Sequence, residues 1–193
     1  MTRGSGFHRM NVALLAALST ALSIALPARS AADSTVVFNE IHYHPATAED
    51  QNEWIELHNQ MSVNMDISNW RIDRGVDFTF PEGTIVPGGG YLVVAIDPAA
   101  LKSATGLANI VGPFSGRLSN AGERLRLVNN NRRTMDAVDY GTSGEWPVAP
   151  DGTGVTLAKR NLNLGSEPPA NWRPSAQLGG TPGSPNFPAD TET

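Results

Sequence analysis

The run E-W-I-E-L-H-N, residues 53–59, constrains the fold of this chain more than any other feature. In an extended backbone Ile55 and Leu57 point to one face, and Trp54, Glu56 and His58 point to the other. This period of two residues is typical of a half-buried β-strand and does not fit the 3.6-residue period of a helix. The run therefore predicts a β-strand near the start of an all-β domain.

Strand-like stretches of the same kind recur along the chain, separated by turns rich in its 19 glycines and 14 prolines. The clearest are residues 35–43, 53–59, 76–80, 91–96, 124–127, 134–140 and 155–159. Asp97 followed by Pro98 is typical of a helix N-terminus and predicts one short helix. About nine short strands with one short helix predict an antiparallel β-sandwich, with a small barrel as the second possibility.

The first 32 residues have the composition of a secretory signal peptide. Arg3 and Arg9 precede an apolar run of 15 residues, 12–26, and small residues then allow cleavage after Ala32 or after Ser30. An uncleaved N-terminal anchor is the alternative, although the run is short for a bilayer span. We expect residues 33–187 to form one domain and residues 188–193 a tail or linker, with an irregular closing segment from residue 161.

Charge and cysteine content limit the function. The chain has 14 Lys and Arg against 19 Asp and Glu, and removing residues 1–32 takes away three arginines and no acid, which leaves 11 against 19, a net charge of −8. This excess of negative charge argues against nucleic acid as a partner. Because the chain has no cysteine, disulfides, thiolate nucleophiles and sulfur-ligated zinc are excluded.

Histidines and acids near the start of the domain are the best candidates for chemistry. His42, His44, His58 and Glu56, with Glu53 nearby, carry the nitrogen and oxygen ligands that zinc or iron would use without sulfur. Their spacing matches no regular metal motif, so the competing interpretation is a set of polar side chains on an exposed strand face. No cofactor is expected.

A calcium site is a second possibility, because Glu49, Asp50 and Glu53 cluster in one polar connection. The spacing of a calcium-binding loop is missing, and this favours a solvated acidic loop over a calcium site.

Two groups of side chains suggest ligand binding without catalysis. Arg124 and Arg126 share a strand face, with Arg132 and Arg133 after the next turn, and could bind a polyanion or form a solvated hairpin face. Trp146 and Trp172 lie near prolines in expected loops, where exposed rings could stack on sugars. The alternative for the tryptophans is a place in the core.

An ordered set of short motifs resembles the lamin tail domain in its bacterial, secreted form. The motifs are N-E-I at 39–41, E-W-I-E-L-H-N at 53–59, D-I-S-N-W-R-I at 66–72, F-P-E-G-T at 80–84, L-S-N-A-G-E at 118–123, W-P at 146–147, P-D-G-T-G at 150–154 and G-T-P-G-S-P-N at 180–186. The resemblance covers nearly all of residues 34–187 and implies an immunoglobulin-like sandwich that acts as an interaction module.

From these observations we expect a secreted or cell-surface, non-catalytic module that binds a protein or a polymer of the cell envelope. The alternative is a secreted metal-dependent hydrolase that uses His42, His44 and His58 with Glu56 as base. The ligand, the oligomeric state and any further domains are not determined by the sequence.

Overall fold

The computed structural model of the chain describes residues 1–2 and 35–187. The expected signal peptide and the expected tail at 188–193 lie outside the described residues. The elements in chain order are β1 (Val36–His42), α1 (Glu49–Asn52), β2 (Trp54–Asn59), β3 (Met65–Asp66), β4 (Arg71–Asp73), β5 (Val76–Thr79), β6 (Ile85–Val86), β7 (Tyr91–Ala95), α2 (Pro98–Thr105), β8 (Ile110–Val111), β9 (Ser115–Gly116), β10 (Gly122–Val128), β11 (Thr134–Gly141), β12 (Val155–Lys159), a 3-10 turn (Pro169–Asn171) and β13 (Trp172–Leu178).

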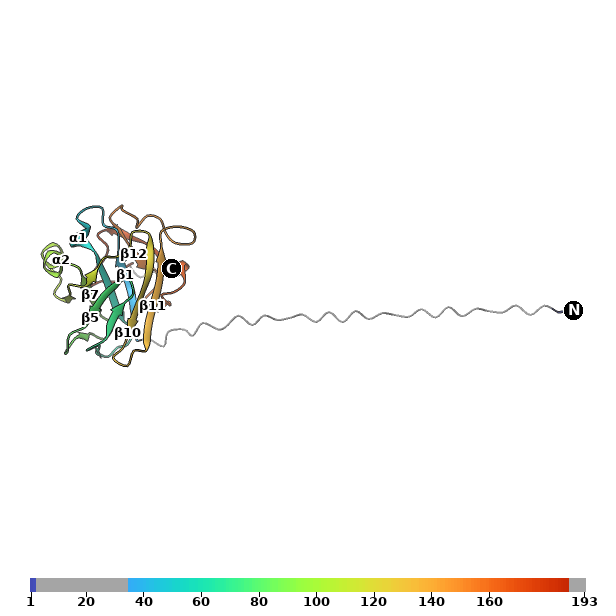
Figure 1. Cartoon of the computed structure of the whole chain (residues 1–193), viewed down its shortest axis with the longest axis horizontal. Helices are drawn as coiled ribbons and strands as arrows, with labels where there is room; N and C mark the ends of the chain where they lie inside the picture. Colours follow the sequence, from blue (N-terminus) through green and yellow to red (C-terminus); the bar gives the residue numbers. More distant parts are fainter. Residues whose placement is uncertain (3–34, 188–193) are drawn as a thin grey trace, which may run out of the picture.

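Two sheets pack face to face as a β-sandwich, which confirms the predicted fold class (Figure 1). One sheet has the strand order β13-β12-β1-β2-β7-β8, and the other has the order β11-β10-β4-β5-β9. A two-stranded ladder, β3-β6, stands beside them. All pairs are antiparallel except β7 with β8, which is parallel and departs from the purely antiparallel prediction.

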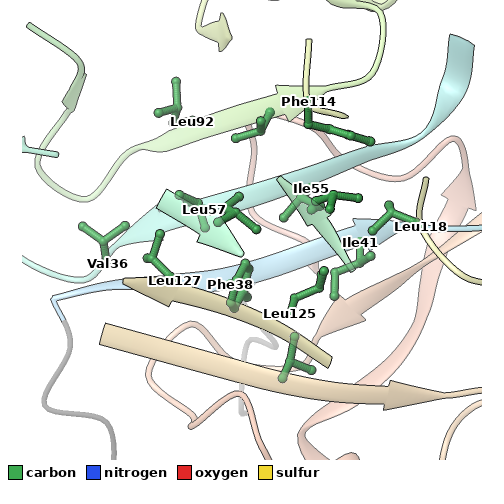
Figure 2. Packing of buried hydrophobic residues seen from close by; sticks show 14 of the residues in the cluster. Val36, Phe38, Ile41, Ile55, Leu57, Leu92, Phe114, Leu118, Leu125 and Leu127 are labelled. Atoms are coloured by element: carbon green, nitrogen blue, oxygen red, sulfur yellow. The ribbon is translucent and has the colours of Figure 1, made fainter. Parts of the chain in front are cut away.

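The core lies between the sheets and is built from the apolar residues that alternate along the strands. Figure 2 shows Ile41, Ile55 and Leu57 of the larger sheet facing Leu125 and Leu127 of the smaller one. All five side chains are fully buried. At about 25 cal/mol per Å² of buried apolar surface, this contact between the sheets is the main source of stability in a chain without disulfides.

Strand β2 differs from its prediction, because it is buried on both faces and not on one. Trp54 packs in a second apolar cluster with Val93 and Ala95, against which Leu101 and Leu107 lie from helix α2 and the residues after it. On the same face, Glu56 is covered by the C-terminal part of the chain and His58 by Tyr91. The alternation of apolar and polar residues shows which side chains share a face of the strand. It does not show whether the polar face is exposed to solvent.

The strands predicted at 124–127 and 134–140 and the predicted helix are confirmed, and α1 and β13 are among the elements that were not predicted. β10 and β11 pair along their whole length. Asp97 is the N-cap of helix α2, and its Oδ1 accepts from the Ala100 amide at 2.9 Å. The single turn α1 was not predicted. Strand β13 lies in the segment that was expected to be irregular. It was not predicted because it contains Pro174, which a sheet accepts here because β13 is an edge strand. None of the helices in the described part of the chain has the length and apolar character needed to cross a membrane.

Candidate functional site: a buried carboxylate pair beneath the C-terminal strap

Residues 179–187, which we call the strap, cross the outer face of the larger sheet and bury a set of polar side chains there. Asn39, Glu40 and Glu56 are fully buried, and each bonds to the strap. A register shift between Phe38 and Glu40 marks a β-bulge in β1, and it lets two consecutive residues, Asn39 and Glu40, both face the strap. The outer face of this sheet is therefore a second, polar interior.

Glu40 receives its hydrogen bonds from the strap and from β12. The Thr181 amide donates to Glu40 Oε2 at 3.1 Å, and the Thr181 hydroxyl donates to the same oxygen at 3.1 Å. The Thr156 hydroxyl donates to Oε1. Gly180 has a φ of 71°, and a Cβ there would lie 2.5 Å from Glu40 Oε1, so only glycine lets the strap approach this carboxylate so closely.

Glu56 lies directly opposite Glu40 on β2 and holds the next part of the strap. The Gly183 amide donates to Glu56 Oε2 at 2.5 Å, and Asn39 Nδ2 donates to Glu56 Oε1 at 2.8 Å. Asn186 completes the attachment by donating to the carbonyls of Asn39 and Lys159 at 3.0 and 2.9 Å. The strap is thus bound at three points to three neighbouring strands.

Burial changes the acidity of both carboxyl groups. It raises the pKa of Glu40 to about 7, although the bonds from Thr156 and Thr181 act in the opposite direction. Burial raises the pKa of Glu56 well above its usual value, and the neighbouring Glu40 carboxylate raises it further. Two adjacent carboxyl groups with raised pKa values are a feature of some acid–base sites, but here both meet the chain's own amides and have no surface open to a substrate.

A second buried network joins the two sheets beside the strap. Ser166 Oγ donates to Asp136 Oδ2 at 2.5 Å and accepts from Lys159 Nζ at 2.8 Å, while the Phe38 amide donates to the same Asp136 oxygen at 2.8 Å. Burial lowers the pKa of Lys159 to about 8 and raises the pKa of Asp136, and the attraction between the two groups opposes both shifts.

A lysine bonded to a serine hydroxyl is the arrangement of some nucleophilic catalysts. Here Ser166 is 2% exposed, so no substrate reaches its oxygen. Sequence reasoning missed this network, because its members lie far apart in the chain and no local motif joins them.

The structure does not bring the predicted metal ligands together. His42 pairs with Trp54 and His58 pairs with Val37, so the two histidines stand at opposite ends of the β1–β2 ladder, about 13 Å apart at 3.3 Å per residue. His44 lies elsewhere, with Nδ1 2.5 Å from Asp151 Oδ1. Within the described part of the chain, no three His, Cys, Asp or Glu residues are grouped as a metal site.

His42, His58 and Glu56 do not lie on an exposed face, which corrects the competing interpretation for these three residues, whereas His44 is partly exposed. His42 and His58 are buried, and burial lowers the pKa of both, to about 4 for His42. Of the calcium candidates, Glu53 is buried and accepts from the Leu118 amide at 2.9 Å. The side chains of Glu49 and Asp50 lie outside the described residues, so calcium binding there stays a prediction.

The ligand-binding candidates have structural neighbours. Arg126 forms an ion pair with Asp73 through two hydrogen bonds of 2.7 Å each. Arg124 lies opposite Asp139 on β11, so positively and negatively charged side chains are neighbours on this face of the sheet. Trp172 is buried, contrary to the expectation of an exposed ring, and its Nε1 donates to the Ser166 carbonyl at 2.8 Å. Trp146 is partly buried against Trp172, with ring centroids 6.5 Å apart.

Comparison with known proteins agrees with this architecture. A search among curated proteins found no match to the chain. The family model of the Lamin Tail Domain matches residues 29–142, more than half of the 193 residues, and this family has an immunoglobulin-like β-sandwich fold. The match spans β1 to β11, the strands that form most of both sheets. The chain therefore belongs to the lamin tail domain family.

Proposed function

We propose that this chain is an exported, non-catalytic module that binds a protein or an envelope polymer at the cell surface. The observation that carries the proposal is that the polar side chains of the E-W-I-E-L-H-N run contact the backbone of the chain itself. Glu56 bonds to the strap, Glu53 bonds to Leu118, and His58 Nδ1 lies 3.1 Å from the Gly90 carbonyl. Side chains that hold the chain's own backbone are poorly placed to act on a substrate.

Export is supported by the sequence of residues 1–32, with its positive start, apolar run and small residues before Asp33. Expression of the full chain in a secreting host, followed by intact-mass measurement, tests this part. We expect a mature protein that begins at Asp33 or Ala31. Recovery of the uncleaved chain from the cytoplasm alone would contradict export.

The binding role is tested with the purified exported protein. Immobilised cell-wall polysaccharide, nucleic acid and secreted proteins are offered in parallel, and a variant with scrambled surface charge serves as control. We expect retention on a protein or envelope polymer and none on nucleic acid, because the exported chain has a net charge of −8. Retention no greater than that of the control on every surface would contradict a binding function.

The hydrolase alternative makes a different prediction for the same preparation. It requires stoichiometric zinc or iron after purification, and loss of that metal in His44→Ala. We expect the metal content of the wild type and of His44→Ala to be equal, because His44 pairs with Asp151 and lies apart from His58. A metal that His44→Ala removes would favour the hydrolase.

A further inference from the structure

The end of the sandwich where the chain enters the fold has an unusual surface. Gln60 connects its parts, because the Gln60 amide donates to the Thr35 carbonyl at 2.8 Å and Gln60 Nε2 donates to the Leu162 carbonyl at 2.6 Å. Four loops meet there, and we call them together the entry end: residues 60–64, 87–90, 129–133 and 160–165. Figure 1 shows the lower ends of β10 and β11, which carry loop 129–133, beside the point where the chain enters.

Exposed apolar side chains gather at the entry end. Met61 is 44% exposed, Val63 is 58% exposed and Leu164 is 37% exposed. They belong to two loops that Gln60 holds together. A cluster of exposed large apolar residues on a small domain is a common mark of an interaction surface.

The charge of the entry end is opposite to that of the whole protein. Its four loops contain Arg132, Arg133 and Arg160 and no acidic residue, although residues 33–193 have a net charge of −8. Of the acids next to these loops in the chain, Asp136 is buried, and Glu167 is exposed two residues beyond loop 160–165. Arginines beside exposed Met, Val and Leu make a surface that is both cationic and apolar.

Hydrogen bonds order the loops of the entry end, and the buried side chain of Asn59 holds two of them. Asn59 Nδ2 donates to the carbonyls of Val63, Val86 and Pro87 at 2.8, 3.0 and 3.1 Å, and Asn59 Oδ1 accepts from the Met61 amide at 3.0 Å. In loop 129–133, Asn129 Oδ1 accepts from the amides of Asn131 and Arg133. Loops that are already ordered lose little entropy when they bind.

Before the signal peptide is cleaved, the apolar N-terminal run places this surface next to the membrane. Eight residues separate Leu26, the last of that run, from Thr35, the first residue of the described fold. At about 3.5 Å per residue the nine steps from Leu26 to Thr35 reach at most ~32 Å, so the entry end of the uncleaved precursor stays close to the bilayer that residues 12–26 enter during export. This step rests on the export proposed above.

We propose that the entry end is a docking surface for an anionic lipid bilayer. Met61, Val63 and Leu164 enter the headgroup region, and Arg132 and Arg160 pair with lipid phosphates. Burial of apolar side chains together with electrostatic attraction is the usual basis of such interfacial binding. Each arginine at an anionic surface contributes roughly a fivefold factor to the docking equilibrium.

The lack of cysteine in the chain gives a direct test, because one introduced cysteine is labelled alone. Full-length Val63→Cys is labelled with an environment-sensitive fluorophore and reconstituted into vesicles of phosphatidylcholine and phosphatidylglycerol. Val148→Cys is the matched control, since Val148 is 67% exposed and lies near Asp151, which bonds to His44 beyond the other end of β1. We expect a blue shift at position 63 and none at position 148. Equal shifts at the two positions, or none at position 63, would overturn the proposal.

Charge variants and a competitor define the partner. Arg132→Gln with Arg160→Gln should lower the docking constant about thirtyfold on anionic vesicles, whereas Arg124→Gln, on the outer face of the smaller sheet, should change it less than twofold. An equal decrease of the docking constant in Arg124→Gln and in the double variant would contradict docking through the entry end. A DNA oligonucleotide that produces the same shift at position 63 would show a general polyanion surface and overturn the lipid assignment. Because these vesicles bypass export, docking can fail while export holds, and the reverse.

Discussion

Glu40 and Glu56 face each other across β1 and β2, and the same C-terminal strap covers both carboxyl groups. Like charges directly opposite on neighbouring strands normally destabilise a sheet. Here burial raises both pKa values, and the amides of Thr181 and Gly183 stabilise whatever charge is present. The pair therefore acts as an anchor for the strap, and its ionisation sets how firmly the strap is held.

Glu56→Ala should loosen the strap. The change leaves the Gly183 amide and Asn39 Nδ2 without their acceptor, and a buried unsatisfied donor costs about 1–3 kcal/mol. We expect the Gly183 amide to exchange hydrogen about a hundredfold faster, measured by NMR. Glu145→Ala, at an exposed loop position, is the control and should leave this rate unchanged. Unchanged exchange in Glu56→Ala would show that the strap is held by other contacts.

Glu40→Gln should change the pH dependence of stability. Because the pKa of Glu40 is about 7 in the folded protein and 4.5 as its usual value, the folded state binds the extra proton between these two values. The contribution of Glu40 to stability is therefore full below about pH 4.5 and is lost as the pH rises through 7.

The free energy of unfolding of Glu40→Gln, relative to that of the wild type, should increase by about 3 kcal/mol between pH 4.5 and pH 8. Urea unfolding of both proteins across this range measures the difference. The comparison cancels the opposing contribution of His42, whose pKa of about 4 makes the protein more stable as the pH rises to 6.5. A difference that does not vary with pH would mean that Glu40 ionises normally in the fold.

Trp172→Ala should destabilise the domain by about 4 kcal/mol. The indole is buried, and it donates to the Ser166 carbonyl. Trp146→Ala should cost clearly less, because that ring is only partly buried. Chemical denaturation of the two variants separates a core role from a sugar-binding role, in which Trp172→Ala would leave stability intact and weaken retention on polysaccharide.

Asn59→Ala should cost about 2 kcal/mol and release loops 60–64 and 87–90 together, because one side chain serves three carbonyls and the Met61 amide. We expect faster amide exchange at Met61 and at Gly89, whose amide donates to the Met61 carbonyl at 2.7 Å. The amide of Gly183 in the strap is the internal control. Release of the strap instead of these loops would contradict the role given to Asn59.

Local patterns in the sequence predicted much of the fold. Alternation identified the central strands, and Asp97 with Pro98 marked helix α2, because both depend on contacts between near neighbours in the chain. Strand β13 was not predicted, because its proline-containing sequence has no clear alternation of apolar and polar residues and its pairing with β12 depends on the tertiary structure.

The sequence by itself determined a β-sandwich of the lamin tail domain family and placed Ile55 and Leu57 in its core. Only the tertiary structure decided that Glu56, Glu53 and His58 are also buried. Their burial depends on the strap and on loops that lie up to 127 residues away in the chain. The period of a strand fixes which side chains share a face, whereas the path of the rest of the chain fixes what covers that face.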